Sequence, residues 1–392
     1  MAQYIGNGVV MMRPVYIAGT GLTAVGELWE RTALSLATEA LRAAMTASPQ
    51  QPIGALYVAN ALGAALGQQS NLAPAIAAAV GLQGCETLTI DAGGAAGGLA
   101  IRQAMLAVAS GAYDAVAVVG VEKVSDVLDE QREAALALTT DGDWEGLHGV
   151  TLTSQWAMLM RKYMHDYAVA SADFAAFPVN AHANAVANRH ALYRFAITPD
   201  KVKNAGMVAD PLSLLDCATV ADGAAAVIIS AQPHTSTVRA VRIAGSGVAS
   251  DAIALHERAD MLDLAAVRLA TTRALHQANL TINDVQALDM TDPHAICAVL
   301  TLEALGYTPR GTATTLGASG AISANGTVPL ALTGGCKARG DVVGALGVYQ
   351  IVELTAQLRG TAANQVANAT VALATCSAGL ASTAVTHVLV AE

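Results

Sequence analysis

The chain has 392 residues, of which 54% are hydrophobic and 13% are charged. At about 100 to 200 residues per domain, this length predicts two or more structural units, and the apolar content excludes disorder for most of the chain. Acidic residues outnumber basic ones by 31 to 21, giving a formal charge of −10, and the lysines and arginines are dispersed. We therefore expect no nucleic-acid partner.

The sequence contains no segment that predicts a membrane span or a secretory leader. A transmembrane helix needs about 18 consecutive apolar residues, and the longest charge-free span, residues 43–85, is interrupted by Pro49, Asn60 and several glutamines. Residues 1–11 lack a basic region followed by a sustained apolar core. We expect a cytoplasmic protein without membrane contact, in which residues 1–11 form an extension.

Five cysteines are scattered along the chain, and none belongs to a CxxC pair or has a histidine at zinc-site spacing. They are Cys85, Cys217, Cys297, Cys336 and Cys376. Free cysteine is among the most buried residue types. We therefore expect free thiols and no metal site.

Short runs of Val, Ile and Leu alternate with longer Ala-rich segments. The runs 15–18, 56–59 and 115–119 predict strands, and the segments 32–45 and 99–110 predict helices. Such alternation is typical of an α/β fold.

The second half of the chain repeats the first at low resolution. Residues 15–21, VYIAGTG, reappear as residues 241–247, VRIAGSG. Each copy is followed by a predicted helix and then by a strand, at residues 53–57 and 285–289. A repeat longer than half of the chain indicates two similar halves related by duplication; chance similarity in Ala- and Gly-rich sequence is the alternative.

The repeat suggests the domain boundaries. We expect an extension over residues 1–11, an N-terminal half over 12–235 and a C-terminal half over 236–392. Residues 141–204 have no counterpart in the second half, and we interpret them as a helical insertion that covers a site. Its histidines His182 and His190 fit surface or core positions better than a site.

Glycine-rich turns follow several predicted strands. Gly19-Thr20-Gly21 does not fit a dinucleotide site, because the next glycine is Gly26 and no acidic residue follows a clear second strand. Residues 93–98, GGAAGG, and residues 333–344 form two strand-to-helix elbows, and a third turn is expected at residues 376–379. An elbow places a side chain over a helix N-terminus, which favours an anion or a thiolate. The first elbow carries no nucleophile, and we expect the three turns to converge on one cavity.

These turns resemble those of the thiolase superfamily, most closely the branch with archaeal-type acetyl-CoA acetyltransferases and sterol-carrier-protein-type thiolases. The resemblance runs from Met12 to the C-terminus, and its most specific stretches are residues 110–123, 209–217, 222–226 and 347–354. It implies a duplicated five-layer α/β/α/β/α fold in which the insertion forms a loop domain. It also implies a homodimer, or a dimer of dimers, formed through the strand Thr87 to Asp91.

Family members acylate a cysteine at the first elbow and use a histidine in a Gly-His-Pro turn as its base. By the resemblance, Gly94 stands where that cysteine would be, and Asp341 stands at the histidine position. Cys376 corresponds to the second family cysteine. His294 lies one helical turn beyond Thr291, which replaces the residue that positions a water.

The resemblance therefore suggests Cys376, Asp341 and His294 as the remaining catalytic candidates. It suggests His148, Gly340 and Gly379 as lining an acyl-CoA pocket. Cys336 and Cys85 lie near the elbows and are weaker candidates for a relocated nucleophile. We expect no cofactor apart from a CoA thioester as a ligand.

Three functions remain open at this point. The first is a thiolase-like protein that binds acyl-CoA without classical thiolysis or Claisen condensation. The second is an acyltransferase, or another acyl-CoA enzyme, that uses Asp341, His294 or Cys376. The third is a structural subunit, because relatives in this branch are found with a small zinc-ribbon and OB-fold partner.

Overall fold

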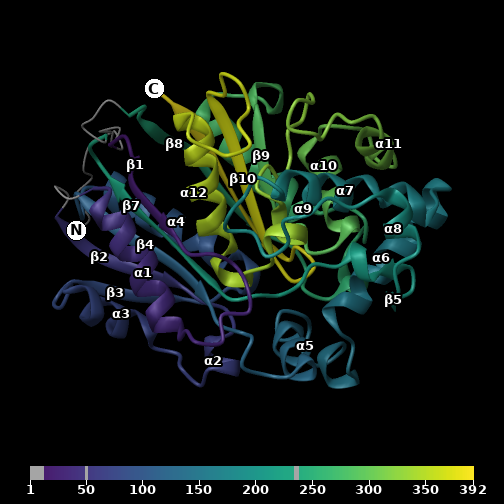
Figure 1. The fold of residues 1–392 in the computed structure, drawn as a ribbon, viewed down its shortest axis with the longest axis horizontal. Helices are drawn as coiled ribbons and strands as arrows, with labels where there is room; N and C mark the ends of the chain where they lie inside the picture. Colours follow the sequence, from purple (N-terminus) through teal and green to yellow (C-terminus); the bar gives the residue numbers. More distant parts are fainter. Residues whose placement is uncertain (1–12, 49–51, 234–237) are drawn as a thin grey trace, which may run out of the picture.

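The computed structural model describes residues 13–48, 52–233 and 238–392. Two sheet halves enclose two buried helices, α4 (Ala96–Ala109) and α12 (Leu346–Arg359), and further helices cover the outer face of each half (Figure 1). This is the expected five-layer α/β arrangement. The fold prediction is therefore confirmed.

In the part of the chain that the structure describes, nine strands form one sheet in the order β3-β2-β4-β7-β1-β8-β11-β10-β9. The strands of the N-terminal half are β1 (Tyr16–Leu22), β2 (Ile53–Ala59), β3 (Glu86–Ile90), β4 (Ala115–Glu122) and β7 (Gly223–Ser230). Those of the C-terminal half are β8 (Val241–Ser250), β9 (Ala287–Met290), β10 (Val371–Ala378) and β11 (Thr383–Ala391). The halves are joined where Tyr16 of β1 pairs with Arg242 of β8. β5 (Met207–Ala209) and β6 (Leu212–Ser213) pair separately.

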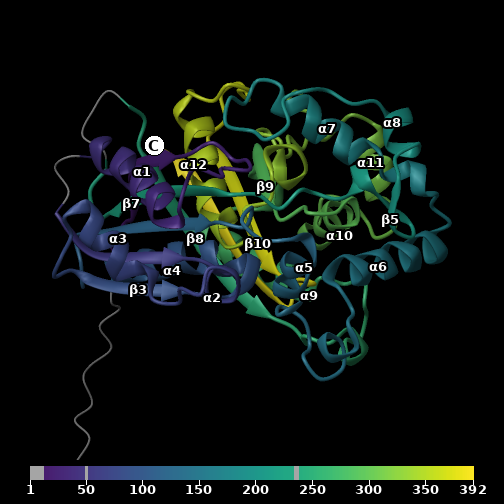
Figure 2. The ribbon, with the colours of Figure 1, turned by 60° about the horizontal axis from the view of Figure 1, so that its bottom comes forward.

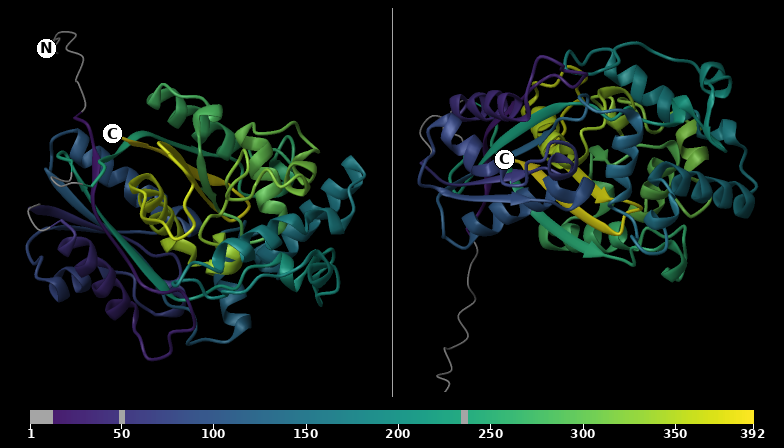
Figure 3. Two further views of the ribbon diagram at one scale, coloured as in Figure 1. Left: turned by 45° about the horizontal axis from the view of Figure 1, so that its top comes forward. Right: turned by 90° about the horizontal axis from the view of Figure 1, so that it is seen from below.

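The outer helices are α1 (Ala33–Thr46) and α3 (Leu72–Val80) on the N-terminal half, and α9 (Ala265–Ala278) and α10 (Ala295–Leu305) on the C-terminal half. α12 lies between the two halves of the sheet (Figure 3). It is buried on nearly every side, including at the polar residues Gln350, Glu353 and Gln357, because other elements pack all round it.

The repeated glycines explain the similarity of the two halves. A Cβ added to Gly21 of β1 would lie 2.2 Å from the carbonyl oxygen of Ala40 in α1. A Cβ added to Gly247 of β8 would lie 2.0 Å from the carbonyl oxygen of Ala270 in α9. Both glycines therefore permit an outer helix to approach its strand closely. The Gly-x-Gly segments lie inside β1 and β8 and not in turns, and they serve packing in each half.

The segment 141–204 is largely helical, as expected for the insertion. It contains α6 (Leu152–Tyr167), α7 (Ala176–Ala185) and α8 (Pro199–Lys203). α6 and α7 lie beside α10, α7 also contacts α11 (Ala313–Ala318), and α8 packs against α7 (Figure 2). α5 (Asp129–Ala137) precedes it, and the short α2 (Gly63–Leu66) lies next to α5. Within the described residues, none of the helices is both long and apolar enough to span a bilayer.

The histidines of this segment differ in burial. His182 is buried, and its Nδ1 lies 3.1 Å from the carbonyl oxygen of Phe195. Its ring stacks on Tyr193 at a centroid distance of 5.9 Å. His190 is half-buried beside Arg189.

Candidate functional site

The N-termini of α4 and α12 meet at the centre of the molecule. Each is preceded by a 3-10 turn, η1 (Gly93–Ala95) and η8 (Val343–Ala345). A Cβ on Gly347 of α12 would lie 2.4 Å from the amide nitrogen of Gly98 in α4. The helices therefore cross with their backbones nearly in contact, which brings both elbows to one place.

Gly94 occupies the first elbow, and the end of β10 closes the space beside it. A Cβ on Gly94 would lie 2.5 Å from the carbonyl oxygen of Ser377. Thr139 covers the other side, because its side chain faces Gly93 and its carbonyl oxygen faces Gly379. Replacing Gly94 with any larger residue therefore requires the backbone of β10 to move.

Partly exposed residues from several elements surround this elbow. They are Gly94, Thr139, Thr291, Ser377 and Gly379. The hydroxyl of Thr291 accepts a hydrogen bond of 2.9 Å from the amide of Ser377, which holds the loop after β9 against the end of β10. Free N–H groups at helix N-termini favour an oxygen that carries negative charge. None of these five residues carries a thiol or an imidazole.

Cys376 lies inside strand β10, so the prediction of a turn at residues 376–379 is wrong over its first three residues. Pairing with β11 continues through Ala378, because small residues in this segment allow the strand to pack closely against α4. The Sγ of Cys376 is buried, 3.9 Å from the carbonyl oxygen of Ala95. Burial raises the pKa of this thiol to about 12, which keeps it protonated at neutral pH.

Asp341 occupies the second elbow, but its carboxylate is turned onto its own loop. Its Oδ1 accepts a 2.9 Å hydrogen bond from the amide of Val343, and the residue is buried. Burial raises the pKa of this carboxyl group. The preceding Gly340 has φ +106° and lies against Val25, so this position of the loop favours glycine.

His294 lies immediately before α10 and is buried among residues of the insertion. Its ring centroid is 6.4 Å from that of Trp156, and its Nδ1 is 3.9 Å from the Sγ of Cys297. Burial lowers the pKa of His294 to about 3, so the imidazole is neutral. The structure places Thr291 at the elbow and His294 deeper in the C-terminal half.

A cavity of about 810 Å³ lies between α5 and the loop that precedes α6. Its lining includes Glu133, Ala137, Thr140, Gly146, Gly149 and Thr151. Thr140 of this lining follows directly after Thr139, which contacts Gly93 and Gly379. His148 is exposed in the turn η2 (Gly146–His148), and its neighbours line the cavity.

The two weaker cysteine candidates lie apart from the first elbow. Cys85 precedes β3, whereas the elbow follows this strand, so the expectation that Cys85 is near an elbow is wrong. Cys336 is fully buried in the π-helical turn η7 (Gly335–Arg339). Burial raises the pKa of Cys336 well above its ordinary value.

Sequence reasoning missed three residues of this region. Ser377 and Thr139 enclose the elbow through backbone atoms, which leave no signal in the sequence. Lys337 could have been noticed, because it is a charged residue in the glycine-containing segment 333–344 that was predicted to form the second elbow.

The fold and the paired elbows define a duplicated α/β class of protein, and two family models match it. The model described as "Thiolase, N-terminal domain" matches residues 15–233, and "Thiolase C-terminal domain-like" matches residues 247–391. The chain belongs to the thiolase family.

Relatives agree with this assignment. An acetyl-CoA acetyltransferase of Methanothermobacter thermautotrophicus is 36% identical, over 96% of this chain and 99% of that protein. The solved structure of an "Ltp2-ChsH2(DUF35) aldolase" is 26% identical with a TM-score of 0.83, covering 97% of this chain and 98% of that one. Human mitochondrial 3-ketoacyl-CoA thiolase shares the fold at 16% identity, with a TM-score of 0.74 over 97% of this chain and 100% of that one.

Proposed function

We propose that this protein binds an acyl-CoA thioester beside the first elbow and does not carry out thiolysis through a covalent acyl-enzyme. The observation that carries the proposal is the lack of a side chain at Gly94 together with the position of the Ser377 carbonyl oxygen, 2.5 Å from where a Cβ would stand. This position therefore provides no sulfur, and it has no space for the Cβ of a cysteine.

The other candidates for covalent chemistry support the same proposal. A thiolate, not a thiol, is the nucleophile in acyl transfer, and burial raises the pKa of Cys376 to about 12. The carboxylate of Asp341 is occupied by the amide of Val343. Neither group is arranged to accept a proton from a thiol.

The cavity supports retained binding. Its volume of about 810 Å³ falls in the range of small-molecule sites, and its lining residues Leu138 and Thr140 flank Thr139, which contacts Gly93 and Gly379. We propose that the acyl thioester occupies this cavity, with its carbonyl toward Gly94. His148 and Gly379 would then lie along its path.

Calorimetry with acetyl-CoA and a thioester-cleavage assay with acetoacetyl-CoA and CoA test the proposal. We expect binding of the thioester without cleavage above the buffer rate. Cys376→Ala serves as the matched variant, since it removes the thiol nearest to the elbow. Robust cleavage by the wild-type protein that is lost in this variant would overturn the proposal.

A subunit of an acyl-CoA enzyme complex is the second candidate. Large apolar side chains are exposed around the cavity, namely Leu128, Leu138, Trp144 and Leu147. Exposed apolar groups of this kind mark protein interfaces, and the similar aldolase structure bears the name of a second, DUF35 component. We propose a zinc-ribbon and OB-fold protein as the partner. Purification from the native host would show it, and a chain always isolated without a second polypeptide would exclude it.

A further inference from the structure

The cavity between α5 and the loop before α6 is acidic on one side. Its lining on α5 includes Asp129, Glu130 and Glu133, and no lysine, arginine or histidine is among the residues that line it. Ala134 and Ala137 line it as well, so the lining residues follow one face of the helix. The carboxylates on this face therefore project toward the space that a ligand would fill.

Two of these carboxylates have a structural explanation. Asp129 and Glu130 lie in the first turn of α5, where the helix dipole stabilises acidic residues, and Asp129 forms an ion pair with Arg132. Glu133 lies one turn further along and is half-buried. In the described part of the chain, its carboxylate forms neither an ion pair nor a hydrogen bond. The structure therefore leaves the charge of Glu133 free to act on a ligand.

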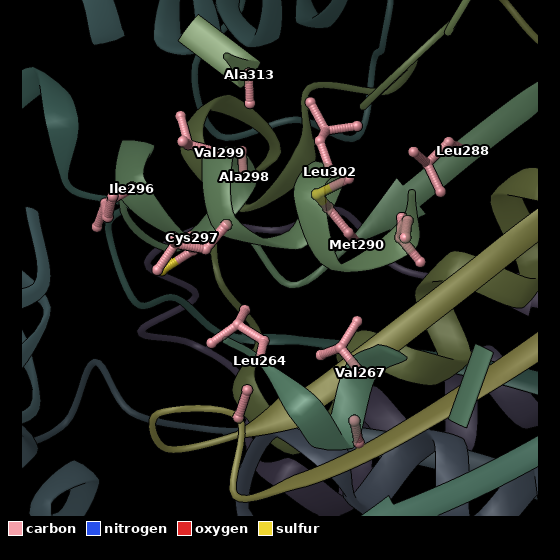
Figure 4. Packing of buried hydrophobic residues seen from close by; sticks show 14 of the residues in the cluster. Leu264, Val267, Leu288, Met290, Ile296, Cys297, Ala298, Val299, Leu302 and Ala313 are labelled. Carbon is pink, nitrogen blue, oxygen red and sulfur yellow. The ribbon is translucent and has the colours of Figure 1, made fainter. Parts of the chain in front are cut away.

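The other wall of the cavity is uncharged and held in place. Its lining residues belong to one loop and are Gly142, Gly146, Gly149, Val150 and Thr151. Glu145 of this loop is buried, and its carboxylate accepts hydrogen bonds of 3.1 Å from the amide of Asp141 and 3.2 Å from the amide of Leu255. Trp156 of α6, the helix that follows the loop, belongs to the buried apolar cluster around α10, whose packing Figure 4 shows. This wall therefore offers no cation to balance Glu133.

The cavity is open to solvent at the same loop. Gly142 and Gly149 line it and are exposed, as is Glu130 on α5. A thioester can therefore enter with its acyl group first, while the phosphates of its CoA moiety remain in water. The acyl group is then the part of the ligand that meets Glu133.

We propose that Glu133 makes the cavity select acyl groups that carry no negative charge. The proposal rests on the proposed function, because it concerns which thioester the cavity accepts. An acyl group that ends in a carboxylate would bring a second negative charge close to Glu133 at a half-buried position, where repulsion is screened less than in water. An acyl group that ends in a methyl group would instead contact Ala137 and Leu138 of the lining.

Calorimetry with butyryl-CoA and succinyl-CoA tests the inference. The two thioesters have the same CoA moiety and the same acyl length, and they differ in whether the chain ends in a methyl group or a carboxylate. Burial raises the pKa of Glu133, and a buffer of about pH 8 keeps its carboxylate ionised. We expect the wild-type protein to bind butyryl-CoA at least about tenfold more tightly, because two like charges repel at short range. Equal affinities, or a preference for succinyl-CoA, would overturn the inference.

Variants of Glu133 assign the selection to this side chain. Glu133→Gln should reduce the preference for butyryl-CoA to about threefold or less, because it removes the charge and keeps the shape. Glu133→Lys should reverse the preference, because an ammonium group attracts the succinyl carboxylate. Glu39→Gln, at an exposed position of α1, is the matched control and should leave the preference unchanged. An unchanged preference in Glu133→Gln would overturn the role of Glu133.

The result is separate from the proposed function. Binding of both thioesters with equal affinity refutes the selection by charge and leaves the acyl-CoA ligand standing. A preference for butyryl-CoA accompanied by thioester cleavage supports the selection and refutes the absence of thiolysis. Binding of neither thioester refutes the acyl-CoA ligand and the selection together.

Discussion

Gly347 allows the two buried helices to cross at backbone distance. Adding one methyl group would place it 2.4 Å from the amide nitrogen of Gly98 and 2.8 Å from the carbonyl carbon of Gly97. Neither atom can rotate away, because both belong to the backbone of α4. The position of both elbows therefore depends on a residue that carries no side chain.

We expect Gly347→Ala to lower the free energy of unfolding by about 2 kcal/mol, because overpacking of a dense core is destabilising. Urea denaturation measures this change in the free energy of unfolding. Gly206→Ala is the matched control, since a Cβ at Gly206 meets no atom within 4 Å. An equal effect of the two substitutions would contradict the close helix crossing.

His294 makes the stability of the protein depend on pH. Burial lowers its pKa from 6.5 to about 3 in the folded state, so the unfolded chain binds a proton more readily. Stability is therefore complete above the unfolded pKa and falls as the pH drops below about 6.5. Between pH 6.5 and about 5 the loss amounts to about 2 kcal/mol for this group.

We expect His294→Gln to lose less stability than the wild-type protein on acidification over that interval. Urea denaturation at the two pH values measures the difference. His387, whose pKa burial lowers to about 4, contributes equally to both proteins. The exposed His165 provides the control, and His165→Gln should behave as wild type.

At the level of elements, an ion pair connects η7 to α12. Nη1 of Arg339 lies 2.6 Å from Oε2 of Glu353, and both residues are buried. The hydroxyl of Thr333 donates to the same carboxylate oxygen. This pair holds the segment before the second elbow against the helix that follows it.

We expect Glu353→Gln to destabilise the protein by about 3 kcal/mol, because it removes the hydrogen-bonded counter-charge of the buried guanidinium of Arg339. The exposed pair of Arg31 and Glu39 is the comparison, and Glu39→Gln should cost less than about 1 kcal/mol. Similar losses of unfolding free energy at both sites, measured by thermal or chemical denaturation, would show that burial of the Arg339–Glu353 pair has no effect.

On the scale of the whole molecule, β3 is an edge strand of the sheet. It carries Leu88, whose side chain is 43% exposed. An exposed edge strand is a template for pairing with another chain. We propose that two copies of the protein associate through β3, as expected from the resemblance for residues 87–91.

The substitution Leu88→Asp should convert the dimer into monomers, because it places two charges close together across the symmetric interface. Light scattering on the purified protein measures the molecular mass. Leu147→Asp changes a more exposed leucine away from this edge and should leave the mass unchanged. A wild-type protein that is monomeric at every concentration tested would exclude the interface.

The fold followed from the sequence to a large extent, and the site only in outline. The strand and helix predictions at residues 15–18, 32–45 and 115–119 agree with β1, α1 and β4 within a few residues. Cys376 was misplaced because a run of small residues is compatible with both a strand and a turn. The burial of Lys337 was not predicted, because the sequence shows a charged residue without showing what surrounds it.

Patterns of residues along the chain were sufficient for the α/β class, the duplication and the absence of a thiol at Gly94, since periodicity, repetition and residue identity are local properties. The surroundings of these residues depended on the tertiary structure. The Ser377 carbonyl beside Gly94 and the hydrogen bond from the Ser377 amide to Thr291 join segments distant in sequence, whereas the carboxylate of Asp341 is capped within its own loop. Burial and mutual distance decide pKa and reactivity, and they exist only once these segments pack together.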